Sequence, residues 1–500
     1  MNSNEARAAG PADAAAPPAA RVSHRRRTIG RVLGPTVFVL MLLLPPPEGL
    51  EPAAWRVAAA ALLLAIFWLS EALPVAATAL LPLAIFPLLG VAPIQQAAAP
   101  YANPLIFLFL GGFLIGLAIE RSNLHRRIAL TVLNRVGARE DLQIGGFIVA
   151  TAALSMWVSN TATAVMMLPV ALSIIPRDAQ GNIEPAKAGF AAALLLSVAY
   201  AANVGGVATL IGTPPNALLA GFMLETYDVE IGFAQWLLLG LPVSGIMLVL
   251  CWLLLTRWLY RVNRDELPEA RAAISEALQA MGPPSTAEKR VGMVLALTAV
   301  LWITRPLLTN WFPGLLLSDT GIAIGCALLL FVIPSGAGRG EYLMTWRYAE
   351  RLPWGVLLLF GGGLSLAAAV ADSGLAEGIG AALGGLAAWP TVMLVVVVAT
   401  LIVLLTELTS NIATSATFLP IVAALAVSIG ADPLLLSVPA IVAASFAFML
   451  PVATPPNAIV FSSGAISIPQ MVRAGIWLNI LGVVTIVAVV YVLLGVVFGV

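Results

Sequence analysis

Two short motifs place hydroxyl and amide side chains side by side within long apolar stretches. Ser159-Asn160-Thr161 precede a run that reaches Leu168-Pro169, and Ser410-Asn411-Ile412 stand 251 residues later, before Leu419-Pro420. Hydroxyl and amide oxygens are hard ligands for a cation such as sodium, whereas the amide NH₂ and the hydroxyl proton can donate to an anion. Each motif therefore carries groups for both a cation and an anion.

A second pair of motifs follows the first pair in the same order. Thr213-Pro214-Pro215-Asn216 match Thr454-Pro455-Pro456-Asn457, which lie 241 residues later. Two successive prolines remove backbone donors and interrupt a helix, which frees upstream carbonyl groups to bind a cation. Helix N-termini that begin just after each Ser-Asn pair would direct positive dipole ends toward the same place, which suits an anion.

The alternative interpretation is that these clusters are solvent-exposed turns. It is disfavoured because the four motifs form two pairs in the same order and lie deep in apolar sequence. Gly111-Gly112 and Gly362-Gly363 repeat at the same offset of 251 residues as the Ser-Asn motifs. The chain is therefore predicted to contain an internal structural repeat.

The composition predicts that the elements holding these motifs are membrane-spanning helices. Of the 500 residues, 60% are hydrophobic and only 10% are charged, too few charges to cover a soluble protein of this size. Apolar runs such as 474–500 exceed the roughly 20 residues that a helix needs to cross a bilayer. These runs lack the alternation of a membrane β-barrel. The fold class is thus predicted to be an all-α polytopic membrane protein.

The net charge and the two cysteines limit the partners and the sites that the chain can have. The net charge is zero, so nothing favours nucleic acid as a partner. Cys251 and Cys326 lie in apolar spans and are predicted to be packing residues rather than a disulfide or a metal pair.

Two apolar segments, 142–175 and 390–429, have polar breaks in the middle. The 34 residues of the first, divided by a turn, give two arms of about 25 Å each, which is marginal for two full crossings. Both segments are therefore predicted to be re-entrant hairpins. Eleven other segments are predicted to be full transmembrane helices: 32–44, 54–69, 72–89, 104–119, 189–222, 234–256, 291–308, 320–333, 353–370, 439–461 and 475–498.

The basic residues predict the orientation of these spans. With the N-terminus in the cytoplasm and both hairpins returning to the face they left, all 25 basic residues except Arg56 and Arg305 lie on the cytoplasmic side. The C-terminus is then outside a bacterial-type inner membrane. Segments 104–119 and 353–370 run in opposite directions, so the repeat is inverted. Inverted repeats with broken helices place a binding site at mid-membrane, an architecture typical of secondary transporters.

The predicted organisation divides the chain into six parts. The arginine-rich start of the chain could be the n-region of a signal peptide, but the many spans behind it favour an uncleaved first span. The parts are a disordered cytoplasmic tail (1–31), scaffold helices (32–103), a first repeat (104–233) with hairpin 142–175 and a broken helix at 212–216, scaffold helices with a cytoplasmic linker (234–352, linker 257–290), a second repeat (353–473) with hairpin 390–429 and a broken helix at 453–457, and a last helix (474–500).

The sequences SNTATAVMMLPV, GTPPNALLAG, TELTSNIATSATFLPI and ATPPNAIVFSSG resemble the motifs of the divalent anion/sodium symporter family. The resemblance covers roughly residues 30 to 500. It implies secondary transport of succinate, other dicarboxylates, citrate or sulfate with sodium as the coupling ion. It also implies a scaffold domain with a homodimer contact and a transport domain that moves as an elevator.

The resemblance also implies roles for particular residues. The first sodium site would comprise Ser155, Ser159, Asn160 and Gly212, and the second Thr406, Thr409, Asn411 and Ala453, partly through backbone carbonyls. The substrate would contact Ser159, Asn160, Thr161, Thr213, Ser410, Asn411, Thr454 and Pro455. We expect import of a C4-dicarboxylate such as succinate together with sodium.

One departure from the family pattern bears on the substrate. Where many bacterial members repeat Ser-Asn-Thr, the second copy here has Ile412, which removes a hydroxyl group from the site. Citrate and sulfate therefore remain alternatives to succinate. Some relatives exchange dicarboxylates without sodium, but the polar ligand set at both sites favours symport.

Three carboxylates stand in or beside apolar sequence. Glu407 lies three residues before a hairpin tip, where it either takes part in transport or accepts hydrogen bonds from backbone donors near the tip. Glu120 and Asp372, at matching helix ends, are predicted to be caps or loop anchors.

Two other classes of membrane protein are disfavoured. An intramembrane metalloenzyme or histidine protease is disfavoured because the two histidines, His24 and His125, fall in cytoplasmic segments. A channel would have no need of paired sodium-type ligands. The chain is therefore predicted not to be an enzyme.

Overall fold

The computed structural model describes residues 18–499, apart from positions 179, 261, 313 and 339. Its described residues form helices and no β-strand, as the composition predicts. Inside a bilayer each backbone N–H and C=O must find a partner within its own segment, and helices meet this condition. Several helices begin with proline at their first or second position, where the missing N–H costs nothing; Pro52, Pro104, Pro214 and Pro455 are examples.

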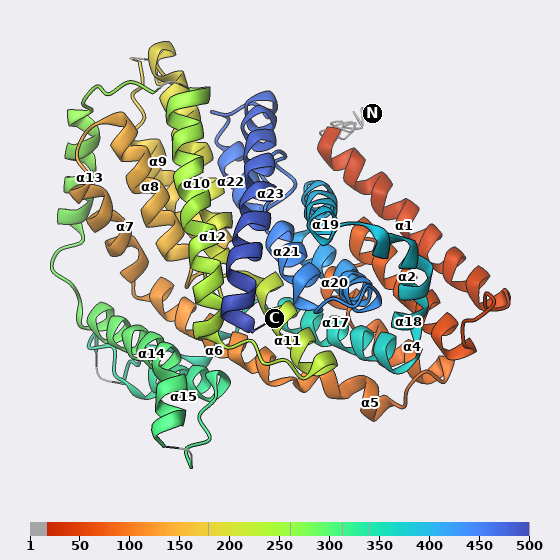
Figure 1. The fold of residues 1–500 in the computed structure, drawn as a ribbon. Helices are drawn as coiled ribbons and strands as arrows, with labels where there is room; N and C mark the ends of the chain where they lie inside the picture. The colour runs from red at the N-terminus through yellow and green to blue at the C-terminus, as the bar shows by residue number, and fades with distance from the viewer. Residues whose placement is uncertain (1–17, 179, 261, 313, 339, 500) are drawn as a thin grey trace, which may run out of the picture.

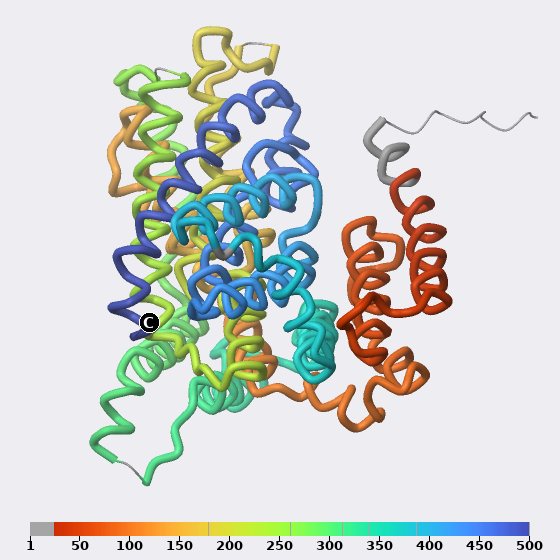
Figure 2. The backbone as a smooth tube through the Cα atoms, turned by 45° about the vertical axis from the view of Figure 1, so that its right-hand side comes forward, coloured from red at the N-terminus to blue at the C-terminus, as the bar shows by residue number. Residues whose placement is uncertain are grey.

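The N-terminal helices form a layer of their own. In Figure 2 these red and orange segments stand beside the rest of the bundle, and an orange stretch connects them to it. The expected tail boundary at residue 31 falls inside α1, and residues 1–17 of that tail lie outside the described residues. The elements are α1 (Pro18–Leu43), α2 (Pro52–Ser70), α3 (Val75–Thr78), α4 (Leu81–Leu89), α5 (Ile94–Ala98) and η1 (Ala99–Ala102).

The first repeat contains a helical hairpin and a broken helix. Helices α8 and α9 meet at the Ser159-Asn160 motif, and six residues separate the end of α10 from α11, which begins at the first proline of the Thr-Pro-Pro motif. The expected single span 189–222 is therefore two helices, and the break between them, 208–213, overlaps the expected break at 212–216 only at its end. The elements are α6 (Pro104–Arg121), α7 (Leu124–Arg135), α8 (Glu140–Ser155), α9 (Asn160–Ser173), η2 (Pro185–Lys187), α10 (Ala188–Val207) and α11 (Pro214–Tyr227).

A central set of helices joins the two repeats. Helix α13 lies in the charged linker and packs against α7, and Ser285 with Glu288 forms a capping box at the start of α14. Both cysteines, Cys251 and Cys326, are buried free thiols, in agreement with a packing role. The elements are α12 (Phe233–Leu253), the π-helical η3 (Leu254–Leu259), α13 (Pro268–Ala280), α14 (Thr286–Trp311), α15 (Asp319–Val332) and α16 (Trp346–Ala349).

The second repeat has the same order of elements as the first. Helices α19 and α20 form a hairpin with the Ser410-Asn411 motif at its tip, and α21 and α22 form a helix broken before Thr454. The last helix, α23, packs against α12, α19 and α21, and Figure 1 shows it in front of the other helices between α12 and α21. The elements are α17 (Trp354–Asp372), α18 (Leu375–Leu383), η4 (Gly384–Ala388), α19 (Thr391–Thr406), α20 (Asn411–Ser428), α21 (Leu434–Ala444), α22 (Pro455–Ser462) and α23 (Ile468–Phe498).

The two repeats interlock through their broken helices. Helix α22 of the second repeat packs against α9 and α10 of the first, and α11 of the first repeat packs against α20 and α21 of the second. Each short helix that follows a Thr-Pro-Pro motif thus lies against the opposite hairpin. The two hairpin tips and the two breaks are thereby brought to one region of the molecule.

The described residues include eight helices that are long and apolar enough to cross a membrane, or nine if the bent pair Leu375–Leu386 and Thr391–Thr406 is one span. Four further apolar segments are shorter. Asn160–Ser173 is an arm of the first hairpin, and Leu434–Ala444 is the first part of the second broken helix. The chain is a multi-pass helical membrane protein. The predicted eleven full crossings, the domain boundaries and the opposite orientation of the repeats stay predictions.

Candidate functional site

A cavity of about 980 Å³ lies where the two hairpin tips and the two helix breaks meet. Its charged lining residues are Arg26, Glu71, Glu120 and Arg351, and Arg26 Nη1 donates to the Leu408 carbonyl at 2.8 Å. Eleven of the residues that the sequence selects line this cavity: Ser159, Asn160, Thr161, Gly212, Thr213, Thr409, Ser410, Asn411, Ala453, Thr454 and Pro455.

At the first tip, three oxygen atoms gather around one hydroxyl proton. Ser155 lies at the end of α8 and is fully buried; its Oγ is 2.6 Å from Asn160 Oδ1 and 2.7 Å from the Ala202 carbonyl oxygen. A hydroxyl group has a single proton, so it cannot donate fully to both oxygens. Three close oxygens with one proton form an electronegative cluster that suits a cation.

The second tip repeats this arrangement with different residues. Thr406 ends α19 and is fully buried; its Oγ1 is 2.8 Å from Asn411 Oδ1 and 2.8 Å from the Ala444 carbonyl oxygen. Ser155 and Thr406 do not line the cavity but stand directly behind the two asparagines that do. The structure therefore brings the hydroxyl and amide of each predicted sodium site together.

The side-chain amides of Asn160 and Asn411 are oriented in the same way relative to the buried hydroxyl groups. Because Oδ1 of Asn160 and Oδ1 of Asn411 face the buried hydroxyl groups, each NH₂ group points the other way. Neither Nδ2 donates a hydrogen bond within the described part of the chain, so both remain available to an anion in the cavity. One amide can thus serve a cation with its oxygen and an anion with its nitrogen.

The other hydroxyl groups at the tips have different environments. The Ser159 side chain caps α9 by accepting a hydrogen bond from the Ala162 N–H at 3.3 Å, whereas Ser410 makes no such bond to α20. The Thr409 hydroxyl is turned to its own hairpin, where it lies 2.8 Å from the Leu405 carbonyl oxygen. Thr409 can therefore offer its backbone to a cation at this tip, but not a free side chain.

The asparagines of the Thr-Pro-Pro-Asn motifs hold the helix breaks open, a role that our sequence analysis did not assign. Asn216 Nδ2 donates to the carbonyls of Val207 and Thr209, at 3.2 and 2.9 Å. Asn457 Nδ2 donates to the carbonyl oxygens of Ala447 and Leu450, at 3.0 and 3.1 Å. The matching position of these asparagines in both motifs was the signal that could have revealed them.

The first break also packs closely against itself. A methyl group on Gly212 would collide with the Gly206 carbonyl, and one on Gly206 would collide with the Asn160 side chain. Thr209 Oγ1 donates to the Met156 carbonyl at 2.7 Å and so ties this break to the first tip. Glycine is required at 212 because the break folds back onto the end of α10, and at 206 because α10 approaches the Asn160 side chain at the tip.

Glu407 ties the second break to the second tip. Its carboxylate is 3% exposed and accepts hydrogen bonds from the backbone N–H groups of Phe448, Met449 and Leu450 at 2.7 to 3.2 Å. It also accepts one from Asn479 Nδ2 of α23 at 2.8 Å. Of the two roles considered for Glu407, its contacts therefore agree with the structural one, in which it accepts hydrogen bonds from backbone N–H groups near the tip. At the first tip the matching position is Met156, which contributes only a backbone carbonyl.

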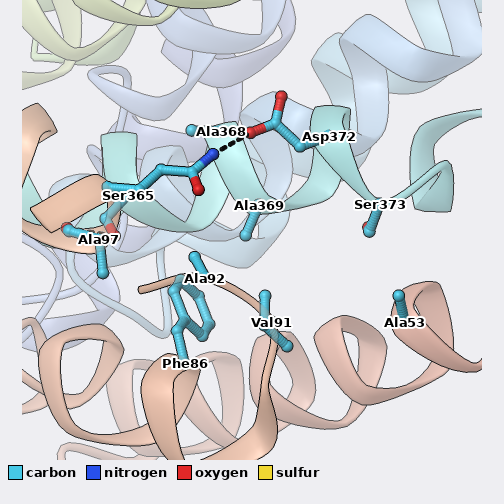
Figure 3. A pocket seen from close by; sticks show the side chains of 11 residues that line it. Ala53, Phe86, Val91, Ala92, Ala97, Ser365, Ala368, Ala369, Asp372 and Ser373 are labelled. Carbon is cyan, nitrogen blue, oxygen red and sulfur yellow. Dashed lines mark hydrogen bonds between the residues drawn. The ribbon is translucent and has the colours of Figure 1, made fainter. Parts of the chain in front are cut away.

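Asp372 ends α17 beside a second, much smaller cavity of about 80 Å³, between α17 and the α4–α5 segment. Figure 3 shows its carboxylate accepting a hydrogen bond from Gln96 Nε2, at 3.0 Å. This contact connects α17 to α5, as expected for a loop anchor. Glu120 instead lines the large cavity.

Nearly the whole chain matches one family of membrane proteins. A model of the sodium:sulfate symporter transmembrane region matches residues 25–499. This chain belongs to the sodium:sulfate symporter family. The resemblance inferred from the four motifs is therefore confirmed. The family model and the sodium-dependent relatives named in the next paragraph are both of transporters, so the chain is a transporter and not an enzyme.

Curated relatives match this chain over nearly its full length. The sodium-dependent dicarboxylate transporter SdcS of Staphylococcus aureus, strain USA300, is 42% identical over 479 residues, which cover 94% of this chain and 92% of the relative. Its counterparts in strains MRSA252 and N315 match over the same lengths with the same identity.

Two solved structures have a similar fold at low identity. The YdaH transporter of Alcanivorax borkumensis is 14% identical, with a TM-score of 0.56 over 96% of this chain and 98% of that one. MtrF of Neisseria gonorrhoeae is 13% identical, with a TM-score of 0.56 over 94% and 97% of the two chains. At this identity they support the helical transporter fold and nothing about the substrate.

Proposed function

We propose that this chain is a secondary active transporter that imports a C4-dicarboxylate such as succinate together with sodium ions across the bacterial inner membrane. The observation that carries the proposal is the pair of oxygen clusters, Ser155–Asn160–Ala202 and Thr406–Asn411–Ala444. The 42% identity to a sodium-dependent dicarboxylate transporter supports the same substrate and ion.

The proposed sites use both faces of the tip asparagines. The first sodium site comprises Ser155, Ser159, Asn160 and Gly212, and the second comprises Thr406, the Thr409 backbone, Asn411 and Ala453. The dicarboxylate lies in the cavity between them, where Ser159, Asn160, Thr161, Thr213, Ser410, Asn411, Thr454 and Pro455 face it. Sodium at the two clusters neutralises part of the dianion's charge, and this attraction couples the two fluxes.

Uptake by proteoliposomes tests this function. Labelled succinate, citrate and sulfate are offered in turn, with sodium, with potassium and with neither. Succinate uptake should rise steeply with sodium, potassium should not replace sodium, and unlabelled dicarboxylate should compete. Sodium-dependent uptake of citrate or sulfate alone would reassign the substrate within the family. Undiminished dicarboxylate counterflow without sodium would make the protein an exchanger.

The inverted topology that we propose has its own test. Arg177 follows the first hairpin and Ala431 follows the second, and both native cysteines are buried. With an impermeant maleimide, Arg177→Cys should be labelled only from the cytoplasmic face and Ala431→Cys only from outside. Labelling of both from the same face would contradict the inverted repeat. The elevator movement and the homodimer remain part of this proposal.

A further inference from the structure

Asn203 on α10 belongs to the first repeat but contacts the binding motif of the second. The side chain is 1% exposed and lies on the wall of the large cavity. Its Nδ2 donates to Thr454 Oγ1 at 3.0 Å. The bond thus joins a residue of the first broken helix to the Thr-Pro-Pro motif of the other half.

The direction of the Asn203 amide is fixed by a second contact. Nδ2 also lies 3.5 Å from the Ala447 carbonyl oxygen. If the amide were flipped, its oxygen would face this carbonyl oxygen, and the two acceptors would repel each other. Oδ1 is buried and has no hydrogen-bond partner among the described residues. A buried acceptor without a partner costs free energy, so packing alone does not explain an asparagine at this position. The positive end of the amide dipole is directed at Thr454.

This bond determines what the Thr454 hydroxyl can do. Thr454 Oγ1 accepts from Asn203 Nδ2 at 3.0 Å and from the Asn457 backbone N–H at 3.4 Å. A hydroxyl oxygen has two lone pairs and one proton, so with both lone pairs occupied its remaining capacity is to donate. Thr454 lines the cavity, and a carboxylate placed there would meet a hydroxyl that can only donate.

The first repeat lacks this arrangement. Position 444, at the 241-residue offset from Asn203, is an alanine, and Thr213 makes no side-chain hydrogen bond to cap α11. No hydrogen-bond partner of the Thr213 hydroxyl is found among the described residues, so this hydroxyl can act as donor or acceptor. The two halves of the cavity thus differ in how firmly they hold a hydrogen-bond donor.

We propose that Asn203 is a positioning residue that fixes the Thr454 hydroxyl as a hydrogen-bond donor to one carboxylate of the transported dicarboxylate. The inference rests on the proposed function, because it requires a carboxylate in the cavity. It adds that the second half of the cavity holds one carboxylate in a fixed orientation, whereas the first half meets the other end of the substrate more loosely.

A double-mutant cycle on succinate uptake tests the assignment. Asn203→Leu removes the donor at similar size, and Thr454→Val removes the hydroxyl. Loss of one hydrogen bond to a charged group corresponds to roughly a 30-fold rise in succinate KM for Thr454→Val, and about tenfold for Asn203→Leu. If Asn203 acts through Thr454, adding Asn203→Leu to Thr454→Val should raise KM by less than about twofold.

Two controls separate positioning from a structural role. Combined with Thr213→Val, Asn203→Leu should keep its full tenfold effect, because Thr213 is not its partner. The sodium concentration for half-maximal uptake should stay unchanged in Asn203→Leu. Each variant is checked by thermal melting in detergent. Should Asn203→Leu fail to fold, Asn203→Ser replaces it in the cycle, because its shorter side chain no longer reaches Thr454.

Additive effects of Asn203→Leu and Thr454→Val on KM would overturn the inference, and so would an unchanged KM in Asn203→Leu. Both outcomes are distinct from failure of the proposed function, which would appear as absent sodium-dependent dicarboxylate uptake in the unmodified protein.

Discussion

Asn160→Asp and Asn411→Asp are each expected to abolish most of the affinity for a dianion while sodium binding persists or tightens. The substitution keeps the oxygen that faces Ser155 or Thr406 but replaces the NH₂ donor with a negatively charged oxygen. Two like charges about 4 Å apart repel by roughly 4 kcal/mol at an effective dielectric constant near 20. That repulsion corresponds to nearly a thousandfold loss of anion affinity.

The measurement is the binding of sodium and of succinate to each purified variant, with folding checked by thermal melting. Asn134→Asp is the matched control, because Asn134 lies in α7, away from the cavity, and should change neither affinity. Normal binding and transport of the dianion by both tip variants would mean that the tips are structural turns and that the site lies elsewhere.

Glu407→Gln is expected to weaken the second sodium site and destabilise the fold. The carboxylate accepts hydrogen bonds from three consecutive N–H groups of the second break, and an amide would present its NH₂ group to at least one of them. An unsatisfied buried donor costs about 1–3 kcal/mol, and the loss of the charged acceptor adds to that cost. Ala453 lies in the same break, so its carbonyl should lose its fixed position as well.

For Glu407→Gln, the melting temperature should fall, and the sodium concentration for half-maximal uptake should rise about tenfold or more. Glu120→Gln is the control: Glu120 lines the cavity, whereas its carboxylate accepts no hydrogen bond from the described residues. A Glu407→Gln variant with unchanged melting and unchanged sodium dependence would show that the three N–H contacts do not hold the site.

Local signals predicted most of the elements that build the site. Paired prolines stop a helix wherever they occur, so the breaks before Pro214 and Pro455 could be predicted from sequence. Both hairpins turn at the Ser-Asn motifs because polar side chains interrupt long apolar runs there. Glu407 was selected because a carboxylate in such a run is unusual, but its backbone partners come from a segment some 40 residues away.

Contacts between distant segments could not be predicted. The Asn203–Thr454 bond joins residues 251 positions apart, and nothing in the apolar sequence around Asn203 distinguishes it from a packing residue. Ser155 and Thr406 were taken from the family resemblance, whereas their common position behind the tip asparagines depends on how α8 and α19 pack. The start of α1 at Pro18 was not predicted, because the alanine- and proline-rich beginning of the chain is typical of a disordered tail.

The most direct test of sodium coupling is concentrative uptake into proteoliposomes. With an inward sodium gradient and no other gradient, labelled succinate should accumulate inside above its external concentration. With equal sodium on both sides, or with potassium in its place, succinate should only equilibrate. Accumulation that persists without a sodium gradient, or its absence when one is present, would contradict the coupling of dicarboxylate transport to sodium at the two oxygen clusters.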